Sequence, residues 1–123
     1  MKPRYEGTVR MRIIPVLMAI SLLITHTAGL ANTVEGPGAT TCAQFSNMYR
    51  ANSGIEDMFF TWAQGYMSAL NMNVVASKLP PRELAGGAAD QKRALRSYCT
   101  ENLQKNYIDG VIELYKRLPH QKL

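Results

Sequence analysis

The stretch SGIEDMFFTWAQGYMSALNMNVVA, residues 53–76, decides the fold of this chain. Its apolar residues recur at spacings of three and four, namely Phe59, Trp62, Ala63, Tyr66, Met67, Leu70 and Val74. This period predicts a long amphipathic α-helix. The motif Ser53-Gly54-Ile55-Glu56 predicts a capping box at its start, and two prolines in KLPP, residues 78–81, predict its end. Gly65 weakens a helix interior, so we expect it to admit a closely packed neighbour.

Two shorter helices are predicted on either side of the long one. Thr41-Cys42-Ala43-Gln44 has the pattern of a capping box and opens a helix over about 42–51, which Asn52-Ser53-Gly54 ends. Residues 107–118 form a last amphipathic stretch before Pro119.

A third short helix is predicted over about 91–104, with Asp90 as its N-cap. Leu95, Cys99 and Leu103 recur four residues apart and define its buried face. No alternation typical of a strand persists for more than about four residues. We therefore predict an all-α fold: a small single domain of three to four helices.

Residues 1–31 have the layout of a secretory signal peptide. Basic residues precede an apolar run of twelve residues, 13–24, and small residues follow, with Gly29 at −3 and Ala31 at −1. An uncleaved membrane anchor is the alternative, but the run is shorter than the roughly 20 residues that a bilayer requires. The sequence predicts export, with residues 32–123 as the mature domain and no membrane contact after cleavage.

The positive charge of the chain belongs mainly to this leader. The full sequence has 14 Lys and Arg against 9 Asp and Glu, a net charge of +5. Without residues 1–31, ten basic and eight acidic residues remain, a net of +2. The remaining cations form no block and do not alternate with aromatic residues, so we expect no nucleic-acid partner.

The two cysteines, Cys42 and Cys99, both lie in the predicted mature domain. In an exported chain an even pair is most simply one disulfide. Closing a loop of this length stabilises a small domain by about 4 kcal/mol. The alternatives are weaker, because His120 is the single mature histidine, a zinc site usually takes four N or S ligands, and there is no Cys-x-x-Cys. We predict no metal and no cofactor.

No catalytic residue is predicted, and we do not expect an enzyme. His120 follows a proline in the last four residues, where we expect a frayed tail that cannot position a general base. Phosphate-binding loops, zinc-protease motifs and nucleophile elbows are missing from the sequence. Glu56 and Asp57 are adjacent, so on a helix they diverge by about 100° and suit the positive end of the helix dipole.

Three short motifs resemble the HdeA/HdeB family of periplasmic acid-stress chaperones. They are TCAQF at 41–45, QGYMSALN at 64–71 and YCTEN at 98–102, followed by an aromatic-rich closing helix. The family has Cys-x-x-Phe, a Gly-aromatic-x-x-Ala-Leu-Asn-like stretch, and a second Cys about 24 residues from the end, as Cys99 is here. The likeness spans about residues 41–118.

This resemblance implies a periplasmic, ATP-independent holdase that forms a homodimer near neutral pH. Members of the family dissociate in strong acid, partly unfold and bind unfolded periplasmic proteins on exposed apolar surface. Below about pH 3 most carboxylates are protonated, and the mature chain would approach a net charge of about +12. The residues expected to bind clients are those of the apolar stripe: Phe59, Trp62, Tyr66, Met67 and Leu70. Ordinary core packing is the alternative interpretation of the same stripe.

Two other functions stay open from the sequence. The signal peptide, the helices, the cysteines and a Gly-Tyr motif at 65–66 are also similar to small periplasmic immunity proteins that neutralise cell-wall amidase effectors. Such a protein would bind its effector through a rigid surface, which we expect around the loop at 80–87. The third possibility is a structural envelope protein without a ligand.

Overall fold

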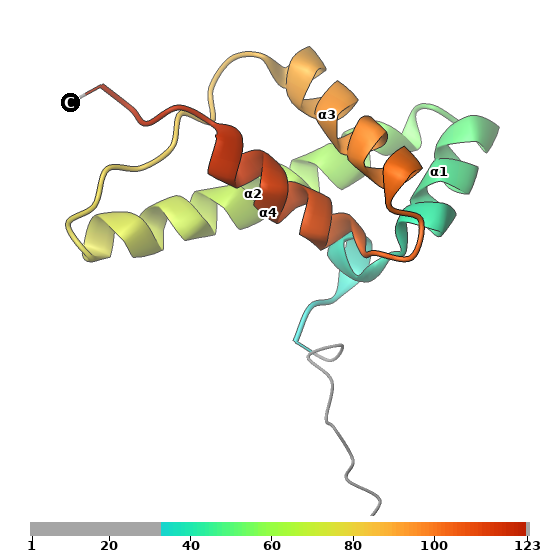
Figure 1. Cartoon of the computed structure of the whole chain (residues 1–123), viewed down its shortest axis with the longest axis horizontal. Helices are drawn as coiled ribbons and strands as arrows, with labels where there is room; N and C mark the ends of the chain where they lie inside the picture. Colours follow the sequence, from blue (N-terminus) through green and yellow to red (C-terminus); the bar gives the residue numbers. More distant parts are fainter. Residues whose placement is uncertain (1–32, 123) are drawn as a thin grey trace, which may run out of the picture.

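Four α-helices and one short 3-10 helix form the fold of residues 33–122, the part of the chain that the computed structural model describes (Figure 1). Between residues 33 and 122 there is no strand, only two isolated bridges. The predicted all-α class is confirmed, whereas the predicted signal peptide, residues 1–31, lies outside the described residues. The elements in chain order are η2 (Gly36–Ala39), α1 (Cys42–Ala51), α2 (Ile55–Ala76), α3 (Ala88–Glu101) and α4 (Tyr107–Arg117).

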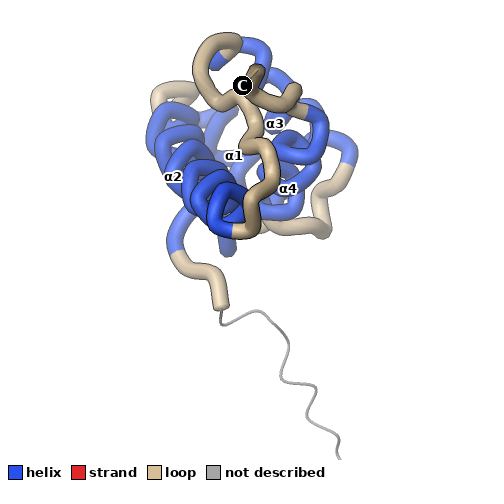
Figure 2. The backbone as a smooth tube through the Cα atoms, turned by 90° about the vertical axis from the view of Figure 1, so that its left-hand side faces the viewer, coloured by secondary structure: helices blue, strands red, loops and turns tan. Residues whose placement is uncertain are grey.

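The long helix α2 is the axis around which the other elements are arranged. In Figure 1 it runs behind α4, with α1 and α3 gathered over its first half. The view along α2 in Figure 2 places α4 beside it, and loop segments lie across the end of this helix pair. The second half of α2 therefore extends past the other helices.

Three aromatic rings form the centre of the core. Phe45, Phe59 and Tyr107 come from α1, α2 and α4, and their ring centroids are 4.9–5.0 Å apart. Each of the three residues is 1% exposed. Tilted and edge-on aromatic pairs at this spacing add to the free energy gained by burying their apolar area. The buried residues around them are Cys42, Phe60, Ala63, Met67, Leu95, Cys99, Val111 and Leu114.

The predicted disulfide between Cys42 and Cys99 is present and connects α1 to α3. Backbone hydrogen bonds close the same end of the molecule: the N–H of Cys42 donates to the Lys105 carbonyl at 2.8 Å. The N–H of Tyr107 donates to the Thr40 carbonyl, also at 2.8 Å. Together these links fix the start of α1 against the turn between α3 and α4.

One predicted capping box is confirmed and the other is wrong. At α1 the Thr41 hydroxyl accepts from the Gln44 N–H at 3.2 Å, and the Gln44 side chain accepts from the Thr41 N–H at 3.1 Å. Helix α2 begins after Gly54 with no capping hydrogen bond from a side chain. Glu56 does not bond back to the helix start, because its carboxylate pairs with Arg96 of α3.

Helix α3 begins and ends three residues before the predicted bounds. Its N-cap is Gly87 and not Asp90, because Gly87 adopts a φ of +65° that turns the loop into the helix. After Glu101 the helix ends, and the Asn102 side chain donates to the Tyr98 carbonyl at 2.8 Å. Leu103 therefore lies beyond the helix and is 48% exposed, so its predicted burial is wrong.

The close helix packing expected at Gly65 occurs at two other glycines. A Cβ at Gly65 would have no atom of another element within 4 Å, so that expectation is wrong. A Cβ at Gly38 would come within 2.0 Å of the Trp62 ring, and one at Gly110 within 2.8 Å of Tyr98. Gly38 and Gly110 thus admit aromatic rings that any larger residue would displace.

The C-terminal tail is paired and not frayed as expected. Residues 119–121 run antiparallel to 81–83, with a bridge between Arg82 and His120. The N–H of Glu83 donates to the Pro119 carbonyl at 2.8 Å, and the N–H of Gln121 donates to the Pro81 carbonyl at 2.9 Å. The loop after α2 and the tail after α4 therefore support each other.

Candidate functional site

The five residues expected to bind clients are buried or half-buried in the folded chain. Phe59 and Met67 are 1% and 0% exposed, respectively, and both belong to the core. Trp62, Tyr66 and Leu70 are half-buried. In this state the stripe packs as core, so it could meet a client only after the helices move apart.

Helix η2 covers the outer edge of this stripe. The rings of Trp62 and Tyr66 are stacked, with centroids 5.5 Å apart and planes 9° from parallel. The Trp62 ring lies against Gly38 of η2, where there is no room for a side chain. Movement of η2 away from α2 would uncover this aromatic pair.

Apolar side chains that are exposed in the folded state lie elsewhere. Three of them are on the last turns of α2 and the residues after it: Met72 is 73% exposed, Val75 55% and Leu79 57%. We call residues 72–79 the distal end of α2. Met72 and Val75 do not belong to the apolar stripe of α2, so its period did not predict where their side chains lie.

Two ion pairs connect the first turn of α2 to α3, whereas the other ion pairs of residues 33–122 lie within single helices. Glu56 pairs with Arg96, and Asp57 pairs with Lys92 at 2.5 Å. The Glu56 side chain is only 12% exposed, whereas that of Asp57 is 78% exposed. The Glu56 pair is therefore the better shielded from solvent and salt.

The same two cations also contact aromatic rings. The guanidinium of Arg96 lies 5.3 Å from the Tyr49 ring centroid, and the ammonium of Lys92 lies 5.4 Å from that of Phe60. These are cation–π distances. Arg96 and Lys92 thus connect α3 to α1 and α2 by charge and by ring contacts. The sequence did not predict this role, because it shows only two adjacent acids and scattered cations.

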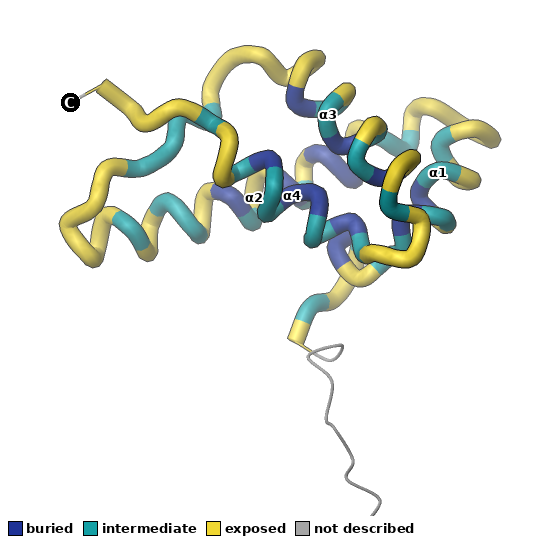
Figure 3. Tube along the Cα trace, viewed as in Figure 1, coloured by how far each residue is buried: buried dark blue, intermediate teal, exposed yellow. Residues whose placement is uncertain are grey.

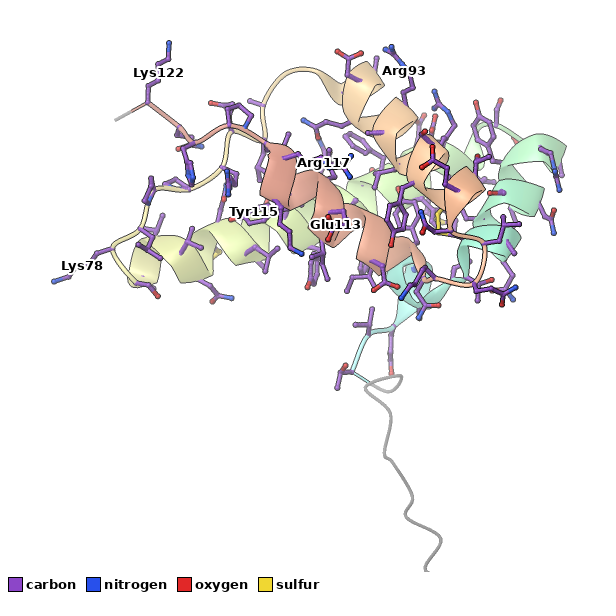
Figure 4. The ribbon with its side chains drawn as sticks, in the orientation of Figure 1. Lys78, Arg93, Glu113, Tyr115, Arg117 and Lys122 are labelled. Carbon is purple, nitrogen blue, oxygen red and sulfur yellow. A yellow bond between two sulfur atoms is a disulfide. The ribbon has the colours of Figure 1, made fainter. Side chains whose placement is uncertain are left out.

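Asn71 holds the loop after α2 and the last helix in place. Its side-chain oxygen accepts from the Arg82 N–H and from the Tyr115 hydroxyl, both at 2.8 Å. Its side-chain nitrogen donates to the Arg82 carbonyl at 2.8 Å. Figure 4 labels Tyr115 among the side chains of α4. Three hydrogen bonds from one side chain tie α2, the loop and α4 together.

Three ionisable side chains have altered proton affinity. Burial raises the pKa of Tyr107 far above its ordinary value, and the negative charge of Glu56 raises it further. Burial and then the charges of Asp109 and Glu113 raise the pKa of Tyr98. A hydrogen bond from Lys116, and then the charge of that lysine, lowers the pKa of Glu113. These three groups are not arranged with one another in the way that a catalytic acid–base pair would require.

A groove of about 570 Å³ lies between α1 and α3. Its apolar lining includes Phe45, Tyr49 and Leu103, and its cationic lining consists of Arg50, Arg93 and Arg96. In the sequence the cations form no block, and nothing in the spacing of these arginines shows that two separate helices bring them together.

The described residues contain neither a metal site nor a spanning helix. Among residues 33–122 no three His, Cys, Asp or Glu side chains are grouped so that they could hold a metal ion. In the same range no helix is both long and apolar enough to cross a bilayer.

Comparisons with protein-family models, with curated proteins and with solved structures gave no match. The resemblance to the HdeA/HdeB family therefore rests on the motifs quoted for it above.

Proposed function

We propose that this chain is an exported, periplasmic holdase that is activated by acid and works without ATP. The observation that carries the proposal is the pair of carboxylates, Glu56 and Asp57, that connects α2 to α3 next to the aromatic core. The family resemblance and the disulfide between Cys42 and Cys99 add support.

Acid weakens the contact between α2 and α3 in two ways. Protonation of Glu56 and Asp57 removes both ion pairs, while Arg96 and Lys92 keep their charge. The loss of all eight mature carboxylate charges also leaves strong repulsion among the cations. Separation of α3 from α2 would then expose Phe60, which is 5% exposed and whose ring the Lys92 ammonium covers.

The disulfide limits how far this opening can go. Cys42 and Cys99 keep α1 joined to α3 in acid, because a disulfide does not titrate. The exposed aromatic side chains therefore stay on one short, tethered surface. A tethered apolar surface that carries a high positive charge can bind an unfolded chain while remaining soluble.

The first experiment measures light scattering by an aggregation-prone periplasmic protein at about pH 2–3, with and without the oxidised mature chain. We expect suppression at a stoichiometric ratio in acid and none at neutral pH. Sedimentation over the same range should show whether a homodimer dissociates. Scattering that the chain leaves unchanged in acid would refute the holdase proposal.

A second experiment tests the two ion pairs directly. The double variant Glu56→Gln/Asp57→Asn imitates protonation, so we expect it to suppress aggregation at a higher pH than the wild-type chain. Asp90→Asn/Glu113→Gln is the control matched in charge, since Asp90 pairs with Arg93 within α3 and Glu113 pairs with Lys116 within α4, so neither pair connects two helices. Equal activation pH for all three proteins would show that the α2–α3 pairs do not control the opening.

An inhibitor of a cell-wall-directed effector is the rival proposal. The Asn71 side chain bonds to the Arg82 backbone and the Pro119 carbonyl accepts from the Glu83 N–H, so the loop beside the exposed Leu79 is preorganised. Capture of one tight stoichiometric partner at neutral pH, abolished by Leu79→Ser, would favour this function over the holdase.

A further inference from the structure

The groove between α1 and α3 has an apolar end and a cationic end. The disulfide joins the first residue of α1 to the last turns of α3, and Arg96 contacts Tyr49 near the other end of α1, so the two helices run antiparallel. Leu103 lies at the disulfide end, where its carbonyl accepts from the Ala43 N–H at 3.1 Å. Arg50 is in the last turn of α1 and Arg93 in the first half of α3, at the opposite end.

The charges of the groove are not balanced by carboxylates. Arg96 pairs with Glu56 and Arg93 with Asp90, but Arg50 contacts the amide oxygen of Asn47, and within residues 33–122 it has no ion pair. Neither Glu56 nor Asp90 lines the groove. Three guanidinium groups therefore border one opening with at least one positive charge in excess, and each keeps planar donors suited to a carboxylate.

The size and lining of the groove match a small ligand. Its volume of about 570 Å³ falls within the range of about 300–1,000 Å³ that is usual for small-molecule sites. Phe45 at its floor is buried, whereas Leu103 is 48% exposed and without cover from the described residues. An apolar body lying along this end would shield Leu103 from water.

We propose that this groove binds a small amphipathic carboxylate, with its apolar chain along Phe45, Tyr49 and Leu103 and its carboxylate between Arg50 and Arg93. This function is independent of the proposed chaperone activity, because it requires the folded state at neutral pH. Arg96 positions the groove through its contact with Tyr49 and is less available to the ligand than Arg93, because its partner Glu56 is 12% exposed whereas Asp90, the partner of Arg93, is 77% exposed.

The test is calorimetric titration of the oxidised mature chain at neutral pH with decanoate, below the concentration at which it forms micelles. We expect one decanoate per chain. Decanol lacks the charge and acetate lacks the chain, so each should bind at least about tenfold more weakly. Decyltrimethylammonium, which has the chain with the opposite charge, should not bind.

Variants locate the site. Arg50→Gln/Arg93→Gln should weaken decanoate binding at least about tenfold, and Leu103→Ser should weaken it by a smaller factor. Arg117→Gln/Lys122→Gln removes the same charge from α4 and the tail, away from Arg93 (Figure 4), and should leave binding unchanged. Near-ultraviolet circular dichroism verifies that each variant is folded.

Three results would overturn the proposal. One is the absence of decanoate binding up to about 1 mM. Another is equal affinity for decanol, which would mean that the arginines contribute nothing. The third is equal weakening by the two double variants, which would show that binding follows net charge and not this groove.

Discussion

The two halves of α2 have the same apolar period but different surroundings. The buried residues of α2 are Phe59, Phe60, Ala63 and Met67, all in the first thirteen residues of the helix. Beyond Met67 no residue of α2 is fully buried: the stripe residues Leu70 and Val74 are half-buried, and Met72, which is not part of the stripe, is 73% exposed. Figure 3 shows this change along α2, from buried residues near α1 to exposed ones near the loop. Periodicity thus predicts a helix, but burial requires elements that cover it.

The two regions are also held by different forces. Aromatic packing, the disulfide and ion pairs stabilise the region around Phe59, whereas hydrogen bonds of Asn71 and the paired tail hold the distal end of α2. Apolar burial contributes more free energy than solvent-accessible hydrogen bonds do. We therefore expect the distal end to open first when the protein is stressed.

The largest expected difference between the halves comes from two methionines of the same helix. Met67→Ala should lower the free energy of unfolding by about 2–4 kcal/mol, because it leaves a cavity in the core. Met72→Ala should change it by less than about 0.5 kcal/mol, because Met72 is exposed. Urea unfolding at neutral pH measures both values. Similar losses for the two variants would mean that a partner or a second copy covers Met72.

A smaller effect is expected at the polar contact of the distal end. Asn71→Ala removes three hydrogen bonds and should cost about 1–3 kcal/mol. Amide exchange at residues 82–84 and 120–121 should accelerate, while exchange in the first half of α2 should not. Asn73→Ala, at an exposed position of the same helix, is the control and should leave exchange unchanged. Uniform acceleration along the chain would show that the two regions unfold as one unit.

The smallest effect concerns alkaline pH and the buried Tyr107. Because burial raises the pKa of its hydroxyl, the folded chain keeps this proton after the unfolded chain has lost it. Stability contributed by the group is complete below about pH 10 and falls as the pH rises above that value. Between about pH 8 and 11 the wild-type chain should lose about 1.4 kcal/mol more than Tyr107→Phe. Equal losses would show that Tyr107 ionises without unfolding.

Local signals in the sequence predicted most of the secondary structure. The capping box at Thr41 and Gln44 and the prolines after α2 gave boundaries that agree with the structure, because backbone hydrogen bonds near these residues decide them. The start of α3 was misplaced since it depends on Gly87 in a left-handed conformation, and a second good N-cap, Asp90, lay close by. The disulfide followed from the count of cysteines and the predicted export.

Contacts between distant segments could not be predicted from local signals in the sequence. The pairing of Glu56 with Arg96 and the convergence of Arg50 with Arg93 depend on how α1, α2 and α3 are packed. A single sequence carries no sign of that packing for polar residues, because many arrangements keep them on the surface. The close approach of a ring to Gly38, and not to Gly65, has the same origin.

The bond between Cys42 and Cys99 also has a consequence for proteolysis. It closes a covalent ring that contains all of α2 and the exposed loop after it, including Lys78, whose φ of +59° places it in the left-handed region. A protease that cuts once after Lys78 opens the backbone but releases no fragment, since the two pieces remain joined through sulfur. A nicked molecule would migrate as one species until reductant separates it, and it would keep α1 and α3 together.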